Sequence, residues 1–280
     1  MKSLTEYIQE QKHNFIIGKK LDSSVKSSNI VIAEDKDHLK KIIKETTSKL
    51  GFECDLNFID VSNVTDMSNL FARSRFNGDI SRWDVSNVTN MNEMFNGARL
   101  FNNDISKWDV SNVVTMNGMF YNTIFDNDIS EWDVSNVKYM KGMFENSKFN
   151  HDISNWNVSN VIDMNSMFCS SIFDQQLNNW NVSNVKSMNF MFSFSIFNQE
   201  LNNWNVSNVD EMYSMFSGSK FDKELNNWNV STCYDFRDMF LKSKFNKDIS
   251  NWDIKDSAFT KNMFEQCQIL EKYKCKLTNK

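Results

Sequence analysis

Apolar residues recur along most of the chain at one fixed period. The eight tryptophans run from Trp83 to Trp252, and the first spacing between them is 25 residues whereas every later spacing is 24. One period before Trp83 stands Ile59, which opens the same motif with the tryptophan replaced. A fixed period of this length is typical of a protein built from stacked repeats. We therefore divide residues 59–272 into nine repeats and number the positions of each repeat from the tryptophan, so that Trp83 is position 1.

Two shorter periods lie inside each repeat. Around the tryptophan, apolar and polar residues alternate, as in Trp83 and Val85, and this period of two predicts a strand with one buried face. Apolar residues then follow at Val88, Met91, Met94, Phe95 and Ala98. Their spacing of i, i+3, i+6, i+7 and i+10 predicts one face of a short helix. The tryptophan, methionine and phenylalanine rows are the predicted core. Stacking such units predicts an α/β repeat solenoid, with a continuous parallel sheet on one face and short helices on the other.

The two ends depart from the repeat. Residues 1–28 are polar and predict a tether or docking tail, or else a mobile terminus. Residues 29–58 predict an N-terminal β-α cap, with a strand at 29–33 and a helix from Asp37 to Leu50 that ends at Gly51. The motif decays toward the C-terminus, where Phe236 and then Thr260 replace the first methionine. Residues 268–280 are predicted to form the C-terminal cap, of which 273–280 lie beyond the repeats.

The joined repeat resembles known repeat families. Ile105-x-x-Trp108-x-Val110-x-Asn112 is similar to the L-x-x-L-x-L-x-x-N core of leucine-rich repeats, with the asparagine one place early. The longer motif F-N-x-D-I-S-x-W-D-V-S-N-V-x-x-M-x-x-M-F resembles the BspA-like repeats of bacterial, mycoplasmal and some viral proteins, over residues 59–272. This resemblance implies a leucine-rich-repeat-like fold and a surface protein that mediates adhesion or host contact.

The net charge and the composition of the chain limit the kinds of partner and the cellular locations that we expect. The net charge of -5, with both signs mixed, argues against nucleic acid because no basic stripe is present to neutralise phosphates. No segment has the length and apolarity of a membrane span or of a signal peptide. The five cysteines are odd in number and irregularly spaced, which favours a reducing compartment. We expect the chain in the cytoplasm of the producing cell or in a virus particle.

The sequence contains no recognisable catalytic constellation. There are three histidines, no Cys-x-x-Cys pair, no phosphate-binding glycine loop and no Gly-x-Ser-x-Gly motif. We therefore expect no enzyme, no catalytic residues, no cofactor and no metal. Two carboxylate rows raise the alternative of a calcium ladder, at Asp79, Asp104, Asp128 and Asp152 and at Asp60, Asp84, Asp109 and Asp133. Both rows are interrupted by amides, which favours carboxylates that accept backbone N–H bonds in turns.

Asparagine forms two further rows. The row at position 5 runs from Asn63 to Asn208 and predicts side chains that bond to the backbone of neighbouring repeats. The other row lies at positions 24 and 2, which the strand alternation turns toward the open side of the predicted sheet. From position 24 of repeat 4 to position 2 of repeat 8 these positions carry no charge, and they present Asn155, Asn157, Asn179, Asn181, Asn203, Asn205, Asn227 and Asn229.

We name these eight asparagines the amide surface. It has two interpretations, a binding face for a glycan or a polar protein, or a ladder in which each amide bonds the one above it. The sequence therefore predicts a non-catalytic scaffold that binds a protein or glycan through its sheet face. The alternative is a structural component of a virus or phage particle, in which the N-terminal tail docks onto an assembly partner.

Overall fold

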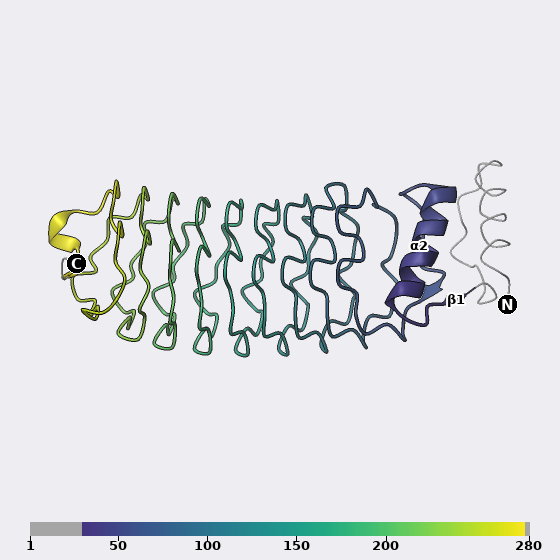
Figure 1. Cartoon of the computed structure of the whole chain (residues 1–280), viewed down its shortest axis with the longest axis horizontal. Helices are drawn as coiled ribbons and strands as arrows, with labels where there is room; N and C mark the ends of the chain where they lie inside the picture. The colour runs from purple at the N-terminus through teal and green to yellow at the C-terminus, as the bar shows by residue number, and fades with distance from the viewer. Residues whose placement is uncertain (1–29, 278–280) are drawn as a thin grey trace.

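The computed structural model describes residues 30–277. Their regular elements are β1 (Val31–Ile32), α2 (Lys36–Leu50), β2 (Ile59–Asp60) and a 3-10 helix, η1 (Glu271–Tyr273). Each repeat makes one circuit of the backbone, and successive circuits lie side by side along the long axis, with α2 at one end and η1 at the other (Figure 1). The predicted tail, residues 1–28, lies outside the described residues.

The N-terminal strand and helix are present where the sequence predicts them. β1 pairs with β2 in parallel, with Val31 opposite Ile59. The carboxylate of Asp35 accepts the N–H of His38 at 2.8 Å and so caps the first turn of α2. The helix ends at Gly51, whose φ of 90° disfavours a residue with a Cβ. Its apolar face, which includes Leu39 and Ile42, is buried in the core.

The predicted α/β solenoid with a continuous parallel sheet and a helix in every repeat is wrong. Within residues 30–277, the only α-helix is α2, and the only sheet is the two-stranded pair β1–β2. From repeat 1 to repeat 9, neighbouring circuits are instead joined by isolated parallel bridges at position 8. The bridged residues are Asp66, Asn90, Thr115, Tyr139, Asp163, Ser187, Glu211, Asp235 and Phe259.

The segment predicted as a short helix is a series of turns. In repeat 2, the N–H groups at positions 12, 14 and 16 donate to the carbonyl three residues earlier, as Met94 does to Met91 at 3.2 Å. The N–H groups at positions 9, 11, 13 and 15 donate to the following repeat instead, as Glu93 does to Asn117 at 2.7 Å. Positions 11 and 15 adopt positive φ in every repeat, which interrupts the helical pattern. The backbone therefore uses half of its donors in this segment to join one repeat to the next.

The tryptophan segment shows the predicted alternation of buried and exposed residues without forming a strand beyond repeat 1. Its backbone is a pair of tight turns, in which Trp83 donates its N–H to Ile80 and Val88 donates to Val85. All eight indole Nε1–H groups donate to a backbone carbonyl near the start of the preceding circuit, at 2.8–3.2 Å. Each tryptophan thus fills the core and also pairs a buried carbonyl of its neighbour.

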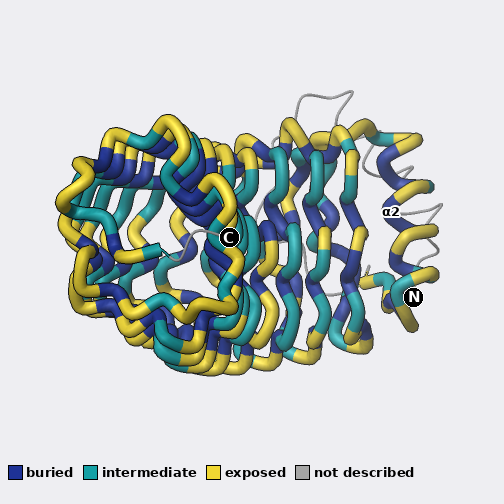
Figure 2. The backbone as a smooth tube through the Cα atoms, turned by 60° about the vertical axis from the view of Figure 1, so that its left-hand side comes forward, coloured by how far each residue is buried: buried dark blue, intermediate teal, exposed yellow. Residues whose placement is uncertain are grey.

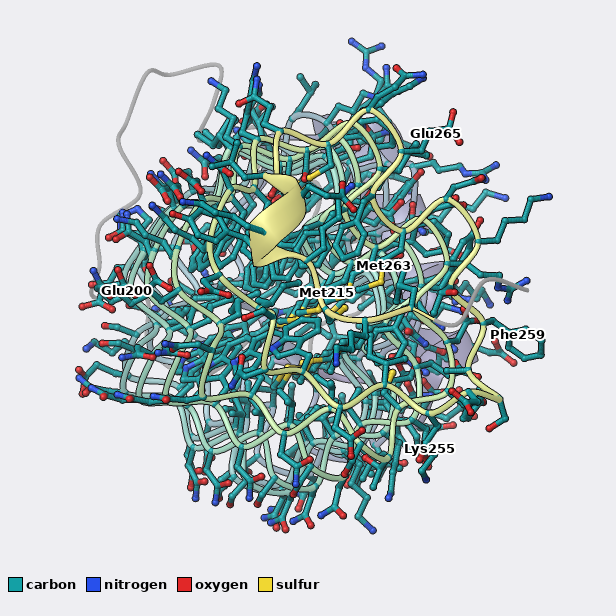
Figure 3. All side chains as sticks on the ribbon, turned by 90° about the vertical axis from the view of Figure 1, so that its left-hand side faces the viewer. Glu200, Met215, Lys255, Phe259, Met263 and Glu265 are labelled. Atoms are coloured by element: carbon teal, nitrogen blue, oxygen red, sulfur yellow. The ribbon has the colours of Figure 1, made fainter. Side chains whose placement is uncertain are left out.

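The core runs the length of the stack, as predicted for the tryptophan, methionine and phenylalanine rows. Phenylalanines at position 13 stack from one repeat to the next, with ring centroids 5.7 Å apart between Phe168 and Phe192. The buried residues in Figure 2 recur at the same place in each circuit. In the end-on view, Met215 and Met263 lie inside the stack, whereas Phe259 and Glu200 project from opposite sides (Figure 3).

Candidate interaction surfaces

The eight asparagines of the amide surface are all exposed. Their expected setting on a sheet face is incorrect, because this part of each repeat is made of turns rather than of strand. The intervening tryptophans and valines are buried, so the side chains at positions 24 and 2 still point away from the core.

The position-2 members of the amide surface bond within their own repeat rather than to each other. The Oδ1 atom of Asn205 accepts the N–H of Ser207 at 3.2 Å and its hydroxyl at 2.7 Å. Asn157 and Asn229 make the same pair of bonds, and Asn181 accepts the corresponding serine N–H. Each is an Asx turn, which fixes the carbonyl oxygen toward the backbone. No described residue accepts a hydrogen bond from the Nδ2 groups of these four asparagines, so the predicted amide ladder does not form there.

Ladders between repeats form in other rows. At position 5, the asparagine Nδ2–H donates to the position-4 carbonyl of the preceding repeat, as Asn136 does to Ser111 at 2.7 Å. This confirms the interpretation of the position-5 row. At position 19, the side-chain oxygen accepts the N–H of the same position in the next repeat. The second ladder was missed, although asparagine or aspartate fills position 19 in every repeat from Asn77 to Asn246.

The two aspartate rows serve the turns, as predicted in preference to calcium binding. Asp109 accepts the N–H of Ser111 at 3.0 Å, and Asp104 accepts that of Ser106 at 2.9 Å. The bond from the Ser106 N–H lowers the pKa of Asp104 below its usual value. Residues 30–277 contain no group of three or more histidine, cysteine or acidic side chains placed to hold a metal ion.

A second surface, near the C-terminal end, was not predicted from the sequence. We name it the aromatic–carboxylate surface; it comprises Phe190, Asp210, Glu211, Tyr213, Tyr234, Asp235, Arg237, Asp238 and Phe259, at positions 7 to 11 of repeats 6 to 9. The guanidinium of Arg237 lies 5.1 Å from the ring centroid of Tyr213 and 5.5 Å from that of Phe259. It also binds Asp235 through two nitrogens, at 2.9 and 2.6 Å. Arg237 therefore stacks between two rings while it pairs with a buried carboxylate.

Glu211 is the other fixed group of this surface. Its carboxylate accepts hydrogen bonds from the Tyr234 hydroxyl at 2.5 Å, from Asn189 at 2.7 Å and from Ser187 at 3.1 Å. The bond from Tyr234 lowers the pKa of Glu211, and the same bond raises the pKa of Tyr234 to about 12. At neutral pH this carboxylate is charged, and no lysine or arginine of the described chain forms an ion pair with it.

A signal for this surface was present in the sequence. Position 10 carries asparagine in repeats 2, 3, 5 and 6, and the side-chain oxygen of Asn165 accepts the N–H of Asn189 in the next repeat. Repeats 7 and 8 replace this asparagine with Tyr213 and Arg237, which cannot continue the ladder. Where a repeat lacks this hydrogen bond to its neighbour, the side chain at position 10 serves another role.

The five cysteines are free. Burial raises the pKa of the Cys233 thiol to about 12 and that of Cys54 and Cys275 to about 11. Burial also raises the pKa of Cys169. Thiols with such pKa values are protonated at neutral pH and are poor nucleophiles.

Comparison with known proteins identifies the repeat. Residues 37–148, 116–196 and 193–276 match, in three overlapping segments, the family described as "Mycoplasma protein of unknown function, DUF285". The chain belongs to this family. The match supports a mycoplasma-type repeat but does not extend to the BspA-like leucine-rich repeats that the motif resembles. No curated protein and no solved structure shows a significant match to the chain. None of the helices in residues 30–277 has the length and apolarity needed to cross a bilayer.

Proposed function

We propose that this chain is a non-catalytic scaffold that binds a neutral glycan through the amide surface. The observation that carries the proposal is the orientation of the position-2 asparagines in repeats 5 to 8. Each carbonyl oxygen is held in an Asx turn, as for Asn205 and Ser207, so each Nδ2 group is left to donate outward. A side chain whose orientation is already fixed loses little conformational entropy when it binds a ligand.

The regularity of the surface favours a linear polymer as the ligand. Successive repeats are joined by parallel bridges, which set neighbouring backbones about 4.8 Å apart. The outward amides therefore form a row of donors at short, equal intervals, and a glycan presents hydroxyl acceptors along its length in the same way. Repeats 2 to 4 carry Asp84, Asp109 and Asp133 at position 2, so the neutral region has a clear boundary. Uncharged donors avoid the cost of desolvating a charge on binding.

Two features support a binding role rather than catalysis. The carboxylates of the repeated aspartate rows accept backbone N–H bonds in turns, as Asp104 does from Ser106. The thiols of Cys54, Cys233 and Cys275 have raised pKa values. These side chains therefore have structural roles instead of the lowered thiol pKa or the paired acid and base that catalysis needs.

The test is to remove the donors while keeping the turns. The variant N157D/N181D/N205D/N229D replaces four amides with carboxylates, and Asp109 shows that aspartate makes the same turn, since it accepts the N–H and the hydroxyl of Ser111 at 3.0 and 2.6 Å. We expect the urea unfolding midpoint to stay nearly unchanged and binding to a panel of neutral linear oligosaccharides to be lost.

The chain offers a matched control for this test. The variant D84N/D109N/D133N makes the reverse change at the same position of repeats 2 to 4 and should retain or strengthen oligosaccharide binding. If the fourfold aspartate variant binds as well as the wild type, the amide surface is not the binding site. If the wild type binds no member of the panel, the assignment of a glycan is wrong.

A further inference from the structure

Arginine is confined almost entirely to the N-terminal end of the stack. Four of the chain's arginines lie between residues 73 and 99, in repeats 1 and 2, and the remaining one is Arg237. Arg82 pairs with Asp55 at 3.6 Å. Arg73, Arg75 and Arg99 are exposed and form no ion pair with any described residue. We name these three the arginine cluster; they occupy positions 15 and 17.

The aromatic–carboxylate surface has the opposite charge balance. Positions 7 to 11 of repeats 6 to 9 carry four carboxylates, at Asp210, Glu211, Asp235 and Asp238, against three cations, at Lys186, Arg237 and Lys261. Arg237 neutralises Asp235, and Lys186 of repeat 6 lies 4.0 Å from Asp210. Glu211 and Asp238 are left without an ionic partner among the described residues. The Oδ1 atom of Asp238 is also buried without a hydrogen-bond donor, which is a costly arrangement for a carboxylate oxygen.

The contacts of Arg237 show how the aromatic–carboxylate surface binds a guanidinium group. Arg237 stacks between Tyr213 and Phe259 and binds Asp235 with two nitrogens. Phe259 is 57% exposed, and Tyr234 is 44% exposed beside the unpaired charge of Glu211. Exposed aromatic rings next to a fixed carboxylate suit arginine better than lysine, because the planar guanidinium can stack and form paired hydrogen bonds at once.

The two regions border the segment at positions 8 to 15, whose backbone joins one repeat to the next, and they lie near opposite ends of the stack. In the end-on view, Phe259 at position 8 and Glu265 at position 14 project to the same side, whereas Glu200 at position 21 projects to the other (Figure 3). The arginine cluster, at positions 15 and 17, follows next along the circuit. Two stacks placed side by side and antiparallel therefore bring the arginine cluster of each onto the aromatic–carboxylate surface of the other.

We infer that two copies of this chain form such an antiparallel, two-fold symmetric dimer, in which the arginine cluster of each copy docks on the aromatic–carboxylate surface of its partner. Because of the two-fold symmetry the contact forms twice, so the arginine cluster and the aromatic–carboxylate surface of each copy are both paired in the dimer. Because both patches are charged and partly exposed, dimerisation weakens as the salt concentration rises.

The test uses the full-length chain and two variants that each break one half of the contact. R73E/R75E/R99E reverses the arginine cluster, and F259A/E211Q removes one ring and one charge from the other surface. Sedimentation equilibrium over a concentration series should show a wild-type dimer and, for each variant, dimerisation weaker by about tenfold or more. A 1:1 mixture of the two variants should dimerise more tightly than either alone, because the mixed pair regains one of the two contacts.

Two control variants test whether a loss of dimerisation is specific to the proposed contact or follows from any change of surface charge. K107E/K223E/K247E makes the same change of net charge at positions 24 and 20, and E200Q/E224Q removes two carboxylates at position 21, on the side of the stack where Glu200 projects. Both should dimerise as the wild type does, and circular dichroism should show that every variant is folded. A wild type that stays monomeric at low salt overturns the inference, and so does a mixture that dimerises no better than its components. A dimer lost equally in the control variants also overturns it.

Discussion

The left-handed backbone at positions 11 and 15 makes the most direct prediction about stability. These positions adopt positive φ in all nine repeats, and fourteen of the residues there are not glycine. Left-handed backbone costs an L-residue roughly 1–2 kcal/mol. The stack tolerates this cost because, in repeats 1 to 8, the N–H at each of these positions bonds the next repeat, as Lys242 does to Glu265 at 2.9 Å.

Lys242→Gly should therefore stabilise the chain. Its φ is 56° and its side chain is exposed, so the substitution relieves strain and removes no core contact. Glycine adds an entropic cost of roughly 0.5–1 kcal/mol, which leaves a net gain of about 0.5–1 kcal/mol in the free energy of unfolding. Lys244→Gly is the matched control, because Lys244 is also exposed but has no positive φ. It should lose about 0.5–1 kcal/mol.

Urea unfolding followed by tryptophan fluorescence measures both variants, and a change of midpoint at constant slope reports stability. The two midpoints should move in opposite directions from that of the wild type. Equal destabilisation by both glycines would refute the reasoning, because it would mean that positive φ at position 15 carries no strain.

Two further predictions concern side-chain hydrogen bonds. Trp156→Phe removes the indole N–H that donates to the Ile129 carbonyl at 3.1 Å, while the Trp132 N–H still donates to the same carbonyl at 3.2 Å. The loss of one of these two bonds should cost about 0.5–1.5 kcal/mol in urea unfolding, and an unchanged midpoint would contradict the role of the indole bond. Tyr234, whose pKa is raised to about 12 by its bond to Glu211, should ionise late among the six tyrosines in an ultraviolet titration, and Glu211→Gln should bring its pKa back toward 10. The folded state binds the Tyr234 proton more tightly than the unfolded state does. The contribution of the Tyr234–Glu211 bond to stability is therefore complete below about pH 10 and is lost as the pH rises through about 12.

Repeat boundaries and the buried rows could be read from the sequence, because burial follows the period of the apolar residues. Trp180, Val182, Met188 and Phe192 are buried, and so are their equivalents in the neighbouring repeats. The turn-forming aspartates and the position-5 asparagines were also predictable, since these side chains bond backbone groups at short and fixed offsets.

The conformation of the backbone between the apolar residues could not be inferred from the same pattern. A spacing of i, i+3 and i+7 fits one face of a helix, but it also fits successive four-residue turns. Glycine and asparagine at positions 11 and 15, as in Gly118 and Asn122, are the residues that favour positive φ. Ten of these eighteen positions carry other residues, such as Phe190 and Lys242, which weakened this signal.

The sequence by itself therefore determined the repeat, the core rows and the exposed asparagines, because these depend on residue types at fixed spacings within one repeat. Only the tertiary structure decided how the repeats are joined and where the charges and rings gather. Arg237 meets Tyr213 and Phe259 only because residues some 24 apart are stacked by backbone bonds between neighbouring circuits. Such contacts depend on the direction of each backbone N–H. That direction follows from whether the local backbone forms a helix or a turn, and the apolar pattern does not distinguish the two.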